Sequence, residues 1–159
     1  MREISRDARE LLEKALKEHM AGNFKEAIEL YQQSIEIQPT AEAYTYMGWA
    51  YSMLGDLETA IDLCLKAIEI DPEFGNPYND IGSYLIALGR PDEAIPWLKR
   101  AISAKRYEPR HYPHMNLAKV YLMKGMFKDA LIEVENAIRL APDYKPAHIL
   151  RHQILAMLN

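Results

Sequence analysis

The five histidines of this sequence are the side chains best suited to metal binding. His148 and His152 are spaced i, i+4, and His111 and His114 are spaced i, i+3, so each pair would share one face of a helix. Imidazole nitrogens placed in this way can supply zinc ligands. However, the sequence contains no HExxH signature, and no neighbouring Cys or Asp completes either pair. We therefore expect the histidines to pack between helices or to lie on the surface, and we expect no metal site.

Nucleophilic catalysis and phosphate binding have no better candidates. Cys64, the single cysteine, falls at a core position of a predicted helix without a neighbouring cue for an activated thiolate, so we expect it to be inert. The glycines Gly48, Gly55, Gly82 and Gly89 follow a regular repeat and do not form a phosphate-binding loop. Because no acid–base or nucleophile constellation is present, we expect that the protein is not an enzyme and has no cofactor.

A basic segment at residues 99–111 is the remaining candidate for direct chemistry. It contains Lys99, Arg100, Lys105, Arg106 and Arg110, which can hold an acidic peptide or a phosphate. The plainer interpretation is a solvated loop, because five charges spread over this length are common on protein surfaces. The formal net charge of −4 gives no electrostatic reason to expect nucleic acid as a partner. Polyanion binding through this segment is therefore kept only as a less favoured alternative.

The elements that position these side chains are clearest in residues 41–74. This stretch reads as two short helices, which are joined by Gly55-Asp56 and closed by Asp71-Pro72. One face of the first helix carries Tyr44, Met47, Gly48 and Tyr51, at the spacing of an amphipathic helix. The small Gly48 lets a second helix approach closely. Such a pair cannot bury its apolar face alone, so it needs neighbours that repeat it.

Three series of small residues show that the pattern does recur. They are Gly22, Gly55, Gly89 and Gly125; Ala27, Ala60, Ala94 and Ala130; and Ser34, Ala67, Ala101 and Ala137. Each series steps by 33, 34 and 36 residues, which indicates a structural repeat with a period near 34. We predict repeats at about 8–40, 41–74, 75–110 and 111–144, and a capping helix at 145–158, within a single domain spanning 1–159. No alternating strand pattern is present, so the predicted fold class is an all-α solenoid.

The repeated residues resemble the tetratricopeptide repeat (TPR) family. The family pattern of aromatic, Leu-Gly and Tyr is approximated in the second repeat by Tyr44, Met47-Gly48 and Tyr51, and more weakly later in the chain. A closing proline follows as Pro39, Pro72 and Pro142. The resemblance covers about residues 8–144. It implies a right-handed solenoid of helix–turn–helix repeats and a non-catalytic module that binds a protein or peptide partner.

In TPR-like proteins the concave groove is lined by the side of each first helix that lies opposite its packing stripe. In the helix at 41–54 this side carries Tyr46, Trp49 and Met53. The full set of expected groove residues is Met20, Tyr46, Trp49, Met53, Asn79, Asp80, Ile86, Tyr112, Met115, Asn116, Lys119 and Met123. Methionine adapts to varied apolar partners, and Trp and Tyr are common binding anchors. We therefore expect an apolar peptide or amphipathic helix anchored at Trp49; the alternative is that the methionines pack under their own second helices.

The groove pattern does not fit the TPR subclass that grips the C-terminal carboxylates of chaperones. That subclass needs Lys and Asn, then Asn, then Lys and Arg at fixed positions of three successive repeats. Repeats 1–3 of this sequence have instead Leu12 and Leu16, then Tyr46, then Asn76 and Asp80. An alternative role, in which the whole surface is structural, is a scaffold or regulatory subunit of a larger complex.

Two features of the later repeats depart from the regular pattern. Pro96 lies inside a predicted second helix and is expected to bend or loosen it. The exit of the third repeat, residues 104–111, is longer than the others, so we expect an enlarged loop or an extra helical turn there.

The C-terminal helix and the composition complete the expectations. Ala147, Leu150, Ile154 and Met157 can pack on the fourth repeat, whereas Ile149, Leu155 and Leu158 point partly elsewhere. These three suggest self-association or docking of a further segment; the alternative is the ordinary exposure of single apolar side chains. The lone cysteine favours a reducing compartment and a cytoplasmic location. The charged N-terminal stretch has no apolar signal core, and no apolar run approaches membrane-spanning length, so membrane insertion is not expected.

Overall fold

The computed structural model describes residues 3–159, which fold into nine α-helices. They are α1 (Arg6–Met20), α2 (Phe24–Ile37), α3 (Ala41–Met53), α4 (Leu57–Ile70), α5 (Asn76–Ala87), α6 (Pro91–Ser103), α7 (His111–Met123), α8 (Phe127–Leu140) and α9 (Lys145–Leu158). Within these residues there is no strand, only one isolated β-bridge. The all-α fold predicted from the repeat is confirmed.

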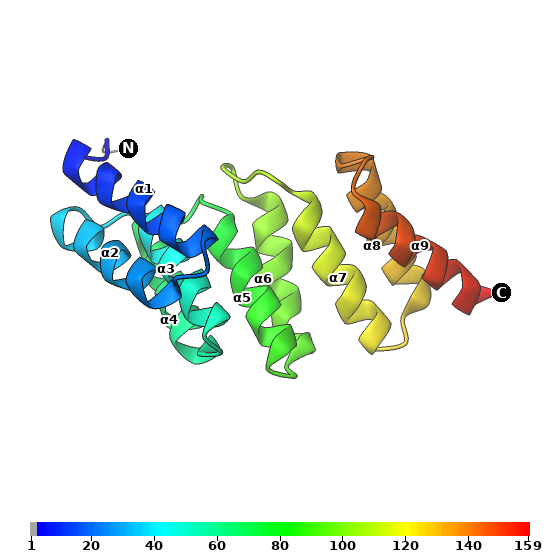
Figure 1. The fold of residues 1–159 in the computed structure, drawn as a ribbon. Helices are drawn as coiled ribbons and strands as arrows, with labels where there is room; N and C mark the ends of the chain where they lie inside the picture. The colour runs from blue at the N-terminus through cyan, green and yellow to red at the C-terminus, as the bar shows by residue number, and fades with distance from the viewer. Residues whose placement is uncertain (1–2) are drawn as a thin grey trace.

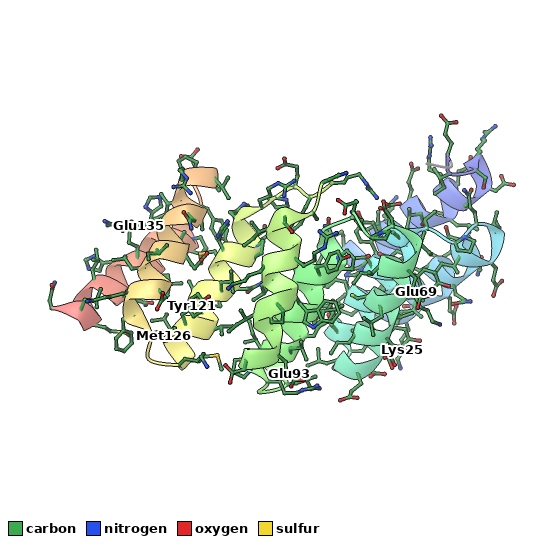
Figure 2. The ribbon with its side chains drawn as sticks, turned by 180° about the vertical axis from the view of Figure 1, so that it is seen from behind. Lys25, Glu69, Glu93, Tyr121, Met126 and Glu135 are labelled. Carbon is green, nitrogen blue, oxygen red and sulfur yellow. The ribbon has the colours of Figure 1, made fainter. Side chains whose placement is uncertain are left out.

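The helices form a row in two layers, with the two ends of the chain at opposite ends of the row (Figure 1). Each helix packs mainly on its neighbours in sequence, and the first helices α1, α3, α5 and α7 also contact one another. Figure 2 shows the other layer from behind, where Lys25, Glu69, Glu93 and Glu135 lie on α2, α4, α6 and α8. The first helices therefore form a layer of their own, which we call the first-helix face.

The turns between paired helices are set by glycine. Gly55, between α3 and α4, has a φ of 87°, a left-handed conformation that side chains with a Cβ rarely adopt. Gly22, Gly89 and Gly125 take the same conformation at the equivalent turns. The next helix is then started by a side-chain cap in α4, where Asp56 accepts a hydrogen bond from the backbone N–H of Thr59.

The small residues of the repeat are the points of closest helix approach. A Cβ added at Gly48 would lie 3.0 Å from the backbone oxygen of Ala60, across the α3–α4 contact. In the next pair, a Cβ at Gly82 would lie 2.4 Å from the Leu98 side chain. Larger residues at these positions would push the paired helices apart.

The exit of the third repeat is the irregular part of the row. Residues 104–110 form an enlarged loop, as predicted, and fold back onto the segment before α5. The Gly75 N–H donates to the Arg106 carbonyl and the Arg106 N–H donates to the Glu73 carbonyl, each at 2.9 Å. The Glu108–Pro109 peptide bond in this loop is cis. The loop is therefore attached to the junction between α4 and α5.

Helix α6 continues through Pro96 to Ser103, so the proline does not end the helix, and the expected bend stays a prediction. One sequence-based expectation about the last helix needs correction. Met157 does not pack on the fourth repeat: 55% of it is exposed, since it lies in the last turn of α9, beyond the buried Ile154. Figure 1 shows this turn at the extreme end of the row.

Candidate binding surface

The first-helix face is held together by side chains that cross from one repeat to the next. At the α1–α3 contact, the rings of His19 and Trp49 lie with their centroids 4.1 Å apart. At the α5–α7 contact, the Asn116 Nδ2 donates a hydrogen bond to the Asn79 Oδ1 at 2.9 Å. Helices α3 and α5 are also in contact, so the four first helices form one continuous surface from α1 to α7.

The apolar part of this surface lies on α1 and α3. Met20 is 68% exposed, Met53 is 54% exposed, and Trp49 keeps about a third of its surface open, at 36%. Met123, at the equivalent end of α7, is 56% exposed. Because these three methionines are more than half open, the alternative in which they pack under their own second helices has little support. The surface instead presents flexible apolar side chains around an indole ring.

The helical projection placed Trp49 on the side opposite the packing stripe, but part of its side chain does pack within the molecule. One side of the indole rests on His19, which lies in the preceding repeat. The Trp49 ring is therefore held from behind and open in front. A rigid aromatic ring in this state can bind an apolar side chain with little loss of conformational freedom.

His19 supports Trp49 and was not assigned a role from the sequence. It is buried, its Nδ1 lies 3.0 Å from the Tyr31 hydroxyl, and its ring meets Phe24 edge-on. Burial lowers the pKa of His19 below its usual value, which favours the neutral ring. The i, i+4 spacing from the packing residue Ala15 was the available signal that His19 faces the neighbouring helix.

Two of the expected groove residues are not available to a ligand. Met115 is only 5% exposed and belongs to the core cluster of Ala118, Ala130 and Val134, so it is a packing residue between α7 and α8. Asn79 is buried, and its side-chain oxygen already accepts the hydrogen bond from Asn116. In this structure the Asn79 side chain joins α5 to α7.

The remaining expected residues differ in how open they are. Lys119 and Tyr112 are exposed on α7, while Ile86 and Asn116 are half-buried. The Tyr112 ring lies edge-on to Tyr144, with centroids 5.8 Å apart, which links this end of the surface to the start of α9. These side chains extend the surface beyond Trp49 with a mixed apolar and polar character.

Asp80 is the acidic residue at the centre of the surface. It is half-buried on α5, and its carboxyl makes no hydrogen bond or ion pair with any group of residues 3–159. Burial raises the pKa of Asp80 to about 7, far above its ordinary value of 3.8. Burial raises the pKa values of Tyr46 on α3 and Tyr107 in the enlarged loop, and the negative charge of Asp80 raises both further. Asp80 is thus close to both aromatic side chains but is unpaired.

The basic segment is largely engaged within the molecule. Arg100 donates to Glu73 at 2.7 Å, and Arg110 donates to the Ile102 carbonyl at 2.6 Å. Arg106 bonds Glu42 and Asp71 together and lies over the Phe74 ring. The arginines therefore attach the loop to the second and third repeats, and they are less available to an anion than the sequence suggested.

A pocket of about 380 Å³ lies where the enlarged loop meets the first-helix face. Its lining residues are Tyr46, Phe74, Asn76, Lys105, Arg106, Tyr107, Glu108 and Arg110. The shared residue Tyr46 joins this pocket to the expected groove.

Metal binding and membrane insertion find no supporting geometry in the described residues. Across residues 3–159, no three His, Cys, Asp or Glu side chains are grouped so that they could hold a metal ion. His114 bonds to Glu133, and His148 and His152 lie on the surface. No helix in this part of the chain is long and apolar enough to cross a membrane.

The helix pairs and their turns can be compared with known protein families. Residues 41–74 match the tetratricopeptide repeat family, and further matches to that family cover residues 21–40 and 63–95. The chain contains tetratricopeptide repeats. The resemblance inferred from the sequence is confirmed, and the match at 41–74 has the bounds predicted for the second repeat.

Similar curated proteins share part of their length with this chain. Small glutamine-rich tetratricopeptide repeat-containing protein 2 of Mycosarcoma maydis is 34% identical over 83 residues, which is 52% of this chain and 24% of that protein. Anaphase-promoting complex subunit 7 of Dictyostelium discoideum is 27% identical over 73% of this chain and 20% of its own length. The chain spans only about a quarter or less of these two relatives.

Solved structures with low sequence identity have the same fold. A structure of PilF from Pseudomonas aeruginosa has a TM-score of 0.88 at 22% identity and covers 95% of this chain and 69% of its own. MamA has a TM-score of 0.73 at 23% identity over 88% of this chain and 81% of its own. Cut9, solved with Hcn1, has a TM-score of 0.83 at 16% identity over 94% of this chain and 30% of its own. At these identities the likeness shows the TPR solenoid alone.

Proposed function

We propose that this chain is a non-catalytic binding module whose first-helix face holds an apolar peptide or amphipathic helix anchored at Trp49. TPR proteins mediate protein–protein interactions, and one relative is a subunit of the anaphase-promoting complex. The observation that carries the finer proposal is the exposed apolar group of Met20, Trp49 and Met53. These residues come from two different repeats, and a ligand contacting them all would span the α1–α3 junction.

The physical basis of the proposal is the contrast between a fixed ring and mobile neighbours. Trp49 is backed by the buried His19, so its open side is preformed. Met20 and Met53 have several rotatable bonds and can adjust to differently shaped apolar side chains. An anchor surrounded by adaptable contacts is typical of surfaces that bind peptide helices.

A scaffold or regulatory subunit is the second candidate, because a separate apolar surface exists at the end of the row. Ile149, Met157 and Leu158 of α9 are all exposed, at 59%, 55% and 37%. A chain with apolar surfaces at two places can bind two proteins at once. In this role the first-helix face would be one of several contact surfaces. A cytoplasmic location, inferred from the lone cysteine, stays a prediction.

Affinity capture from native cell extract, followed by mass spectrometry, tests the proposed function. We expect Trp49→Ala to lose the captured partners that the parent chain retains, because the variant removes most of the apolar anchor. Leu65→Ala is the matched control, since Leu65 is 38% exposed but lies on α4 in the other layer. Circular dichroism establishes that both variants are folded. If folded Trp49→Ala retains the partners at undiminished affinity, Trp49 is not the anchor.

A further inference from the structure

Asp80 is an acidic side chain on the first-helix face that has no ion-pair partner within the described residues. Asp80 lies on α5, the third of the four first helices, and Figure 1 shows α5 between α3 and α7. Its carboxyl is half-buried, and within residues 3–159 no Lys, Arg or His nitrogen forms an ion pair with it. A carboxylate that is partly shielded from water is stabilised by a cationic or hydrogen-bonding partner, because desolvation without compensation is costly.

The neighbours of Asp80 do not neutralise its charge. The groups affected by this charge are Tyr46, Cys64, Tyr84 and Tyr107, none of which is cationic. Arg106, which acts on Tyr46, is already bonded to Glu42 and Asp71. The local structure therefore leaves a negative site on the first-helix face that no group of the described chain neutralises.

We propose that Asp80 is a specificity site that pairs with a lysine or arginine side chain of the peptide bound on the first-helix face. The occupant is a peptide segment of a partner protein that carries one basic residue between apolar residues. The inference rests on the proposed function, because it assumes that the peptide lies across Trp49, and it adds the chemical class of the ligand.

Charge complementarity selects this occupant over a purely apolar one. A bound cation supplies the ion pair that Asp80 lacks and offsets the cost of its desolvation. The half-buried Tyr46 ring beside it can also hold a cation through its π face. The net charge of −4 favours the approach of a basic segment as well.

The positions of the apolar residues explain why the basic residue should be flanked. Trp49 and Met53 lie on α3, to one side of Asp80, and the exposed Tyr112 lies on α7, to the other. A peptide that crosses from α3 to α7 would place apolar side chains at both ends and its basic side chain at α5. The basic residue would thus be a central feature of the recognised sequence.

Selection from a phage-displayed library of random linear peptides tests the inference. The parent chain should enrich sequences with Lys or Arg between apolar residues, and their binding should weaken with Trp49→Ala. For a synthetic peptide of the enriched sequence, Asp80→Asn should raise the Kd about tenfold or more, the usual range for losing a charged hydrogen bond. Selection on Asp80→Lys should enrich Asp or Glu at the same position, which a folding defect would not produce.

Asp62 provides the matched controls. It is exposed on α4, in the other layer, so Asp62→Asn and Asp62→Lys make the same changes in charge away from the first-helix face. Both variants should keep the basic consensus and the Kd of the parent. If they change binding as much as the Asp80 variants do, the effect is general electrostatics and the assignment of Asp80 is wrong.

The remaining outcomes separate this inference from the proposed function. Peptides that depend on Trp49 but show no basic position overturn the role of Asp80 and leave the binding module in place. Basic peptides that depend on Asp80 but not on Trp49 support the specificity site and contradict the Trp49 anchor. If the library gives no peptide that depends on either residue, both proposals are overturned.

Discussion

Asp80 has an energetic cost in the free protein that follows from its position. Burial raises its pKa to about 7, whereas the unfolded chain has the ordinary value of 3.8. The folded state therefore binds this proton more tightly than the unfolded state does, and stability falls as the pH rises from about 4 through 7. A residue that destabilises the free fold in this way is more easily understood if a bound partner neutralises it.

Replacing Asp80 with Asn should accordingly stabilise the protein at pH 8. Because one unit of pKa difference corresponds to about 1.4 kcal/mol and the site is partly open to water, we expect a gain of about 1–3 kcal/mol at pH 8 and little change at pH 4. Urea denaturation at the two pH values measures the difference. An equal denaturation midpoint for parent and variant at pH 8 would show that the carboxyl is well solvated.

The groups around Asp80 do not confuse this measurement. Burial raises the pKa values of Cys64 on α4, Tyr84 on α5, Tyr46 on α3 and Tyr107 in the loop, so these groups stay neutral up to pH 8. Arg106, the arginine that lowers the pKa of Tyr46, stays charged between pH 4 and pH 8. Asp80 is thus the group in this cluster whose charge changes between pH 4 and pH 8.

At the scale of the helix pair, stability depends on small residues that permit close contact. Gly48→Leu and Ala60→Leu each place a large side chain between α3 and α4, where even a Cβ at Gly48 would be 3.0 Å from the Ala60 oxygen. We expect each variant to lose about 1–3 kcal/mol of unfolding free energy in chemical denaturation, as overpacked cores do. The exposed Ser83→Leu, on the first-helix face of α5, is a control that should change stability little. Either core variant proving as stable as the parent would mean that the assigned register is wrong.

Comparison of the helix pairs with the sequence pattern shows which features the pattern can predict and which it cannot. Glycine and alanine at a period near 34 predicted the helices, their turns and their contacts, because each of these needs a small or left-handed residue at a fixed place. A projection of one helix cannot show what the next repeat covers. His19 is therefore buried under Trp49 from the next repeat. Met115, expected among the groove residues, is instead packed in the core between α7 and α8 of its own repeat.

The enlarged loop at residues 104–110 has no counterpart in the other repeats. The sequence predicted that it would be longer than the other connections. Its path, however, depends on long-range contacts that join Arg106 to Glu42 and Asp71 in earlier parts of the chain. These contacts also explain why a segment that looked like an anion site is mostly occupied by its own acidic partners. The unpaired state of Asp80, in turn, depends on where those arginines are held.

At the scale of the whole molecule, helix α9 presents exposed apolar side chains on its surface. Exposed apolar side chains that gather on one helix are candidates for a contact surface with another protein. Here Ile149, Met157 and Leu158 remain exposed beside the buried Ile154. We propose that this face mediates self-association of the chain.

Light scattering coupled to gel filtration tests the association. We expect a mass above that of the monomer at high protein concentration, and a return to the monomer in Ile149→Glu, which places a charge in the centre of the apolar face. Leu65→Glu, at an exposed position on α4, is the control and should leave the mass of the parent unchanged. A parent chain that stays monomeric at high concentration, with the same elution as Ile149→Glu, would rule out self-association through α9. Because the first-helix face lies apart from Ile149 on other helices, loss of association should leave peptide binding at Trp49 intact.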